Sequence, residues 1–263
     1  MKKRLITLMV AGVMVFSLAA CSAQGNTGTD VSAEESSGNS AEAAELETIT
    51  ITSLNGNGEE IELEVPYKPE KVAILDMPSL DIIDSLGEGE RVVGSADTSL
   101  DYLQDYVTSE EVAKLGTIKE ADMEAVMECE PEVIFIGGRL ASVYDDLSKI
   151  APVVYLSTDI EKGVVQSVRE NAETIASIFG KQEEVESLME GFDARIEKLA
   201  SFAADKTAII GLCTSGGFNI LGNDGRCSMI GNEIGFENVG VDADAATSTH
   251  GNEASFEFVV EKD

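Results

Sequence analysis

Residues 163–203 read GVVQSVRENAETIASIFGKQEEVESLMEGFDARIEKLASFA, and this stretch decides the predicted fold. Apolar residues three or four positions apart lie on one face of a helix. The residues that hold this spacing are Val164, Val168, Ala172, Ile175, Ala176, Phe179, Val185, Leu188, Met189, Phe192, Ile196 and Leu199. The stretch is therefore predicted to be one long helical passage that Gly180 interrupts once.

Short apolar runs at 152–156 and 207–213 flank this passage and fit buried strands. Two strand-bearing halves joined by a long helix predict an α/β protein. We expect two Rossmann-like lobes with parallel sheets, bridged by the helix, and a ligand cleft between them. The alternative is an ordinary crossover helix inside one larger α/β domain.

The N-terminal α/β lobe is predicted over residues 48–158. Its first part alternates in polarity on both sides of Asn55-Gly56-Asn57-Gly58, which predicts a β-hairpin from 48–53 and 60–65. Strands separated by helices predict a parallel sheet, whose ligands gather at the carboxyl ends of the strands. The expected strands are 71–75, 91–94 and 133–136, and the expected helices are 78–86, 123–129 and 144–150.

The C-terminal α/β lobe is predicted over residues 205–263, after a helical inter-lobe region at 159–204. Residues 121–130 align with residues 254–263, with helix N-caps at Asp122 and Ser255. The first copy continues into Pro131 and a buried strand, whereas the second copy stops. The sequence therefore predicts a second lobe that is incomplete through C-terminal truncation; the alternative is a naturally short lobe.

The N-terminus has the layout of a bacterial lipoprotein signal. Lys2, Lys3 and Arg4 precede an apolar stretch at 5–18, and Leu18-Ala19-Ala20-Cys21 looks like a lipobox. The resemblance implies a signal peptide at 1–21 and a lipid on Cys21. Residues 22–47 are rich in small and polar residues and predict a flexible tether. The alternative is a plain signal peptide or membrane anchor with a coincidental cysteine.

Charge and motifs limit the functions that the 263-residue chain can have. A formal charge of −31 disfavours nucleic acid and anionic membrane as partners of the bulk surface. The sequence has no nucleophile elbow, Walker A loop or zinc-protease motif, so we expect no enzyme. The three cysteines after residue 21 indicate neither a disulfide framework nor a zinc site, and Cys129 and Cys213 are predicted to be core residues.

Several motifs together resemble a known family. They are the lipobox, PYKPEKV at 66–72, LGT at 115–117, EPEVIFI at 130–136, GGR at 137–139, the long helix and THG at 249–251. They are similar to the iron–siderophore substrate-binding lipoproteins of ABC importers, of the catecholate or petrobactin type. The resemblance covers residues 60–263 and implies a helix-bridged (class III) periplasmic-binding-protein fold. It implies a lipid-anchored monomer on the extracytoplasmic face of the cell membrane, which captures a ferric siderophore, has no intrinsic cofactor and delivers the ligand to a permease.

Arg139 is the first candidate ligand residue, because it follows the predicted strand 133–136 and two glycines. Its planar guanidinium suits the oxygen rim of an anionic ferric catecholate complex. The alternative is a salt bridge to Asp145 or Asp146. Arg226 lies in a turn-rich stretch before a predicted helix at 229–234, and the resemblance makes it a second ligand arginine; its alternative is a solvated loop residue.

His250 is the single histidine of the chain. A neutral imidazole can fill a coordination position of iron that the siderophore leaves open, and the resemblance assigns it that metal role; the alternative is a surface or core histidine. Glu124 and Glu257 occupy matching positions in the two copies of the repeat. Each acid favours the start of its helix, and the resemblance implies that both dock onto permease arginines.

Two other functions remain open from the residues. Haem or cobalamin binding on the same scaffold is one of them, and the absorption spectrum of the ligand would distinguish it. A non-transport surface lipoprotein is the other. In that case Arg139→Ala and Arg226→Ala would leave partner binding unchanged.

Overall fold

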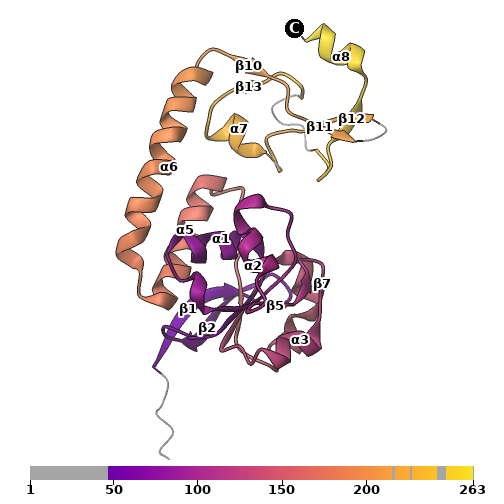
Figure 1. The fold of residues 1–263 in the computed structure, drawn as a ribbon. Helices are drawn as coiled ribbons and strands as arrows, with labels where there is room; N and C mark the ends of the chain where they lie inside the picture. Colours follow the sequence, from indigo (N-terminus) through magenta and orange to yellow (C-terminus); the bar gives the residue numbers. More distant parts are fainter. Residues whose placement is uncertain (1–46, 215–216, 226, 242–246, 263) are drawn as a thin grey trace, which may run out of the picture. The chain divides into compact units, whose positions relative to one another are not determined.

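The computed structural model describes residues 47–214, 217–225, 227–241 and 247–262 (Figure 1). They belong to one compact unit, Glu45–Asp263. We call residues 47–179 the N-terminal lobe and residues 207–262 the C-terminal lobe. The predicted signal peptide with Cys21, the tether up to residue 46, and Arg226 lie outside the described residues.

The predicted N-terminal hairpin is confirmed. Strand β1 (Thr48–Leu54) pairs antiparallel with β2 (Glu60–Pro66) over their whole length. Their turn is stabilised by Asn55, whose side-chain oxygen accepts hydrogen bonds from the backbone N–H groups of Asn57 and Glu59 at 2.9 and 3.1 Å. Ser53 attaches the hairpin to the central sheet, because its hydroxyl accepts a bond from the Tyr155 N–H at 3.0 Å.

The predicted parallel sheet of the N-terminal lobe is also confirmed, and it has five strands in the order β5-β4-β3-β8-β9. Its side chains alternate between two hydrophobic clusters, one on each face. Phe135 belongs to the first cluster, whereas its neighbours Ile134 and Ile136 belong to the second. The strands are β3 (Val72–Leu75), β4 (Val92–Ser95), β5 (Ala113–Lys114), β8 (Val133–Ile136) and β9 (Val153–Tyr155).

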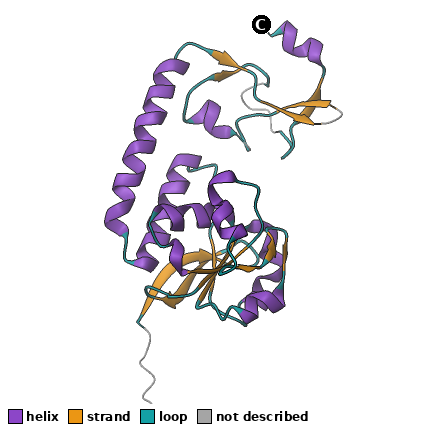
Figure 2. Cartoon of the chain, viewed as in Figure 1, coloured by secondary structure: helices purple, strands orange, loops and turns teal. Residues whose placement is uncertain are grey.

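Helices cover both faces of this sheet (Figure 2). Helices α1 (Met77–Ser85) and α5 (Val164–Phe179) supply side chains to the first cluster, and α3 (Met123–Glu128) and α4 (Tyr144–Leu147) supply the second. Burial on both faces explains why the strands read as unbroken apolar runs. The remaining elements of the lobe are η1 (Gly89–Arg91), η2 (Asp101–Leu103), α2 (Gln104–Thr108), β6 (Gly116–Thr117), β7 (Glu120–Ala121) and η3 (Gly138–Val143).

The predicted helical passage is two helices, α5 and α6 (Gln182–Ala203), and the interruption at Gly180 is confirmed. Gly180 has a left-handed backbone with φ of 68° and ends α5. The next N–H, that of Lys181, turns back to the Ala176 carbonyl at 2.8 Å. A Cβ at Gly180 would lie 2.5 Å from the Tyr67 hydroxyl oxygen and 2.6 Å from Cε of Lys68.

We expect Gly180→Ala to lower the free energy of unfolding by about 1–2 kcal/mol, because it strains a left-handed residue and crowds two side chains. Gly191 provides a matched control. It lies inside α6 with open space around its Cα, so alanine there is expected to stabilise the helix by up to about 1 kcal/mol. Urea unfolding followed by circular dichroism measures both changes. Equal stability of the two variants would contradict this account of Gly180.

The C-terminal lobe differs from the prediction at residues 207–213, which do not form one buried strand. They divide into β10 (Thr207–Ala208), which pairs parallel with β13 (Glu237–Asn238), and the start of β11 (Gly211–Thr214). Strand β11 pairs antiparallel with β12 (Gly217–Ile220), which also pairs antiparallel with β14 (Asn252–Ala254). An antiparallel ladder can expose one face, and the predicted core residue Cys213 is in fact exposed. The helices of this lobe are α7 (Ser228–Asn232) and α8 (Phe256–Glu261).

Candidate ligand-binding site

A cavity of about 220 Å³ lies at the carboxyl ends of β3, β8 and β9, where the parallel sheet predicts a ligand. These three strands are neighbours in the sheet, so the loops after them meet at one edge. The residues that line the cavity are Asp76, Pro78, Ser79, Ile82, Gly137, Gly138, Tyr155, Leu156, Ser157, Thr158 and Asn171. Carboxylate, hydroxyl and amide groups therefore face the same small volume.

Gly137 and Gly138 are needed for space. A Cβ on Gly137 would lie 2.5 Å from Oδ1 of Asp76, and a Cβ on Gly138 would lie 2.9 Å from the Tyr155 hydroxyl oxygen. Neither glycine has a positive φ. The two glycines let the side chains of Asp76, which follows β3, and Tyr155, which ends β9, approach the segment that leads into Arg139. The sequence indicated a close approach here, but the approaching groups include the protein's own Asp76 and Tyr155.

Asp76 both lines the cavity and begins α1. Its Oδ2 accepts bonds from the backbone N–H of Ser79 at 3.0 Å and from the Ser79 hydroxyl at 2.8 Å. Burial raises the pKa of Asp76 above its ordinary value, although the bonds from Ser79 and the positive charge of Arg139 act in the opposite direction. The cavity therefore contains an acid that is harder to ionise than a surface aspartate.

We expect Asp76→Ala to lower the free energy of unfolding by about 1 kcal/mol relative to Asp76→Asn at pH 7, because asparagine keeps the helix cap and alanine does not. The pH dependence has a defined sign. The folded pKa is raised, so the native state holds the proton above the ordinary pKa, and stability falls as pH rises through that range. In Asp76→Asn the loss of stability with rising pH should be smaller, because asparagine does not ionise.

Urea unfolding at about pH 4 and at pH 7 tests both effects of Asp76, since the ordinary aspartate pKa is about 3.9. Equal stability of the alanine and asparagine variants at pH 7 would contradict the capping role. A fall in stability between the two pH values that is as large in Asp76→Asn as in the unsubstituted chain would contradict the pKa argument.

Arg139 lies in η3, directly after the glycine pair, and is exposed. Among the described residues it makes no hydrogen bond or ion pair, although its charge acts on Asp76, so the N–H donors of its guanidinium remain available to a ligand. The alternative from the sequence was a salt bridge to Asp145 or Asp146. Asp146 instead pairs with Lys149 at 2.6 Å, and no ion pair joins Asp145 to Arg139 within the described chain.

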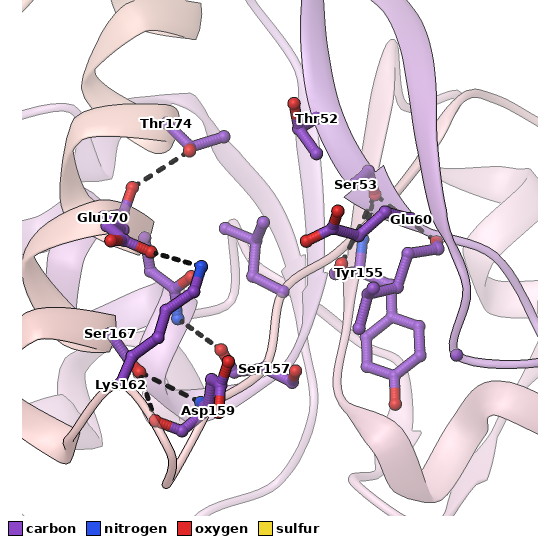
Figure 3. A pocket seen from close by; sticks show the side chains of 14 residues that line it. Thr52, Ser53, Glu60, Tyr155, Ser157, Asp159, Lys162, Ser167, Glu170 and Thr174 are labelled. Carbon is purple, nitrogen blue, oxygen red and sulfur yellow. Dashed lines mark hydrogen bonds and ion pairs between the residues drawn. The ribbon is translucent and has the colours of Figure 1, made fainter.

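A second cavity, of about 660 Å³, lies between the hairpin β1–β2, the loop after β9 and α5 (Figure 3). It shares Tyr155, Leu156, Ser157 and Asn171 with the first cavity. Its other polar groups largely bond one another. In particular, Lys162 pairs with Glu170 at 3.0 Å. This cavity therefore offers a ligand fewer free groups than its size would indicate.

His250 lies in an exposed turn before β14 and lines neither cavity. Its backbone carbonyl accepts a bond from the Asn219 side-chain amide at 2.9 Å, which fixes the turn while the imidazole stays accessible. Among the described residues, no group of three or more His, Cys, Asp and Glu side chains could hold a metal ion. An iron role for His250 therefore requires donors from a ligand, and it stays a prediction.

Glu124 and Glu257 are exposed in the first turns of α3 and α8. The predicted N-caps that precede them are confirmed. Asp122 accepts bonds from the N–H groups of Glu124 and Ala125, and the Ser255 hydroxyl accepts one from Phe258. Neither glutamate forms an ion pair within the described part of the chain. Both carboxylates are thus available to a partner, and their docking role stays a prediction.

The comparison with family models decides the classification. Residues 72–263 match the model described as periplasmic binding protein. The chain belongs to this family. It is 29% identical to the petrobactin-binding protein YclQ of Bacillus subtilis over 260 residues, which cover 98% of this chain and 76% of YclQ. It is 25% identical to the ferric-anguibactin-binding protein FatB of Vibrio anguillarum, over 74% of this chain and 61% of FatB.

Solved structures agree with the observed fold. The crystal structure of YclQ superposes with a TM-score of 0.75 over 82% of this chain and 74% of YclQ. The catecholate-siderophore binding protein VctP of Vibrio cholerae, 27% identical, superposes with a TM-score of 0.72 over 81% of this chain and 75% of VctP. The family predicted from the sequence motifs is therefore confirmed.

The sequence reasoning missed Asp76, Tyr155 and Asn171 as cavity residues. A signal for Asp76 was present, since Asp76-Met77-Pro78-Ser79 follows a buried strand and has the pattern of a capped helix start with an early proline. Tyr155 and Asn171 carried no comparable signal. They come from β9 and α5, and only the tertiary fold brings them to the same cavity.

Proposed function

We propose that the chain is an extracytoplasmic solute-binding lipoprotein that captures a ferric siderophore, of catecholate type, and delivers it to an ABC permease. The match to the petrobactin-binding protein over 98% of this chain carries the proposal. The catecholate-siderophore binding protein VctP has the same fold. An arginine without a hydrogen bond or ion pair in the described chain, beside a carboxyl-end cavity, supports it, because the net charge of −31 would otherwise repel an anionic complex.

Each predicted residue has a physical role in this proposal. Arg139 and Arg226 balance the charge of the ferric complex through charge-assisted hydrogen bonds. His250 supplies an imidazole to iron where the siderophore leaves a position open. Glu124 and Glu257 face the permease, and the lipid on Cys21 holds the protein at the cell membrane. None of the helices in the described ranges is long and apolar enough to cross a membrane.

Quenching of tyrosine fluorescence tests the proposal, because the chain has five tyrosines and no tryptophan. The full chain in mild detergent is titrated with ferric catecholates, a ferric hydroxamate, haem and cobalamin. We expect saturable binding of the ferric catecholates. His250→Ala should weaken it about tenfold, which is about 1.4 kcal/mol, and should shift the visible absorption band of the bound complex.

Each other result has a definite meaning. If the chain binds haem or cobalamin and not the ferric catecholates, its ligand is that compound and not a siderophore. No binding of any of these ligands by a folded chain would contradict the proposal. Catecholate binding that His250→Ala leaves unchanged in affinity and spectrum would remove the iron role of His250 and keep the transport function.

A further inference from the structure

Helix α5 begins without a capping side chain of its own. Its N-cap residue is Gly163, which has no side chain to accept a bond, and its first turn contains no acidic residue. The first N–H groups of a helix need an acceptor from outside the helix, and the partial positive charge there favours a carboxylate. The start of α5 therefore depends on a group from elsewhere in the chain.

Glu233, which follows α7 in the C-terminal lobe, supplies that group. Its Oε1 accepts a hydrogen bond from the Val165 N–H at 3.1 Å. A Cβ on Gly163 would lie only 3.0 Å from the same oxygen, so the glycine leaves room for the carboxylate. The second oxygen, Oε2, is buried and has no hydrogen-bond partner in the described chain. Such burial is unfavourable unless the helix start compensates for it.

Both sides of this contact are firmly held. The side chain of Asn232 bonds to the Asn223 carbonyl at 3.0 Å, and Asn238 of β13 donates to the Asn223 side chain at 3.2 Å, so α7 is tied into the C-terminal lobe. Helix α5 supplies five residues to the first hydrophobic cluster of the N-terminal lobe. The contact therefore joins the C-terminal lobe to the hydrophobic core of the N-terminal lobe, through two residues that are 68 positions apart.

The start of α5 is also connected to the wall of the carboxyl-end cavity. The Ser167 hydroxyl bonds both to the carbonyl and to the N–H of Asp159, at 2.9 and 3.0 Å. The Asn171 side chain donates to the Ser157 carbonyl at 3.2 Å, and both of these residues line the cavity. The Glu233 carboxylate, by holding α7 against α5, also holds α7 against the loop that lines the cavity.

We propose that Glu233 is an inter-lobe clasp. Its carboxylate caps α5 from α7 and keeps the segment that carries α7 fixed against the cavity loop. Glu233 consequently limits the freedom of α7. It is a positioning residue and needs no contact with the ligand.

Hydrogen exchange with residue resolution, on the full chain without ligand, tests the clasp. In Glu233→Ala we expect the Val165 amide and the amides of α7 to exchange about tenfold faster or more, because the capping acceptor is lost. Glu233→Gln keeps an acceptor oxygen and should remain nearer to the unsubstituted chain. The amides of β3 and β8 should be unchanged in both variants.

Glu237→Ala is the matched control, since it removes an exposed glutamate of the same lobe that has no side-chain partner among the described residues. The clasp is overturned if Glu233→Ala exchanges like this control. It is also overturned if β3 and β8 accelerate together with α5 and α7, since that pattern reports general loss of stability.

A second measurement rests on the proposed function. If ligand binding requires α7 to be held against the cavity loop, Glu233→Ala should weaken ferric catecholate binding about threefold or more. Glu233→Gln should largely restore the affinity. Unchanged affinity in Glu233→Ala would overturn the link to binding. If the unsubstituted chain binds none of the ligands, the proposed function fails, whereas the exchange experiment still decides the clasp.

Discussion

Arg139→Ala is expected to weaken the binding of a ferric catecholate by about 10- to 100-fold and to leave the fold intact. Arg139 makes no hydrogen bond or ion pair with any other described residue, so its loss removes only its charge interaction with Asp76, which caps α1 through bonds from Ser79. A hydrogen bond to a charged group contributes about 1.5–3 kcal/mol, and each 1.4 kcal/mol is a tenfold change in affinity. Fluorescence titration of the variant measures the change.

Arg195 provides the matched control for Arg139. It is exposed on α6, it has no ion pair within the described residues, and Arg195→Ala changes the net charge by the same amount. The control should bind the ligand like the unsubstituted chain. Arg139→Lys should recover only part of the affinity, since an ammonium cannot form the paired bonds of a guanidinium. Equal affinity of Arg139→Ala and Arg195→Ala would show that Arg139 takes no part in binding.

The N-terminal lobe could be predicted because local sequence and tertiary environment agree there. Strands such as 133–136 are apolar throughout, and a parallel strand between two helix layers is buried on both faces. Asn55 and Gly58 in the hairpin turn, and Gly180 between the helices, have the conformations that their residue types favour. In these places each local sequence pattern predicted the local structure that is observed.

The C-terminal lobe could be predicted less well, because its strands depend on pairing between distant residues. The apolar run 207–213 fits a buried strand by composition. In the structure, however, its first part pairs with β13 and its last part with β12. Periodicity cannot show which partner a short strand takes. The exposure of Cys213 follows from that pairing, and no feature of its neighbours in the sequence indicated it.

In the candidate site, too, local features could be predicted from the sequence, whereas contacts between distant residues could not. The sequence indicated a functional loop at Gly137, Gly138 and Arg139, because the glycines and the end of a strand are local features. The capped helix start marked Asp76, but no local feature showed that Asp76 and Tyr155 occupy the space that the glycines leave. Glu233 is the clearest example. It caps α5 through the N–H of Val165, which lies 68 positions earlier, so no nearby pattern could assign that role.

Phe135→Ala is expected to lower the free energy of unfolding by about 3–5 kcal/mol. Phe135 is fully buried in β8, between β3 and β9, and it packs in the cluster that α1 and α5 complete. Truncation leaves a cavity at the centre of the sheet, and the surrounding strands can relax only in part. Urea unfolding followed by circular dichroism measures the loss.

Phe256→Ala is the control for Phe135→Ala. Phe256 is 73% exposed, and its ring contact is with Phe218, at 6.1 Å between centroids. Its loss should cost about 1 kcal/mol or less. Because β8 leads directly into Gly137 and Arg139, the Phe135 variant should also bind the ligand more weakly than the control does. A cost below about 1 kcal/mol for Phe135→Ala would mean that this face of the sheet is not the stabilising core, since truncating a buried phenylalanine removes both its transfer free energy and its packing contacts.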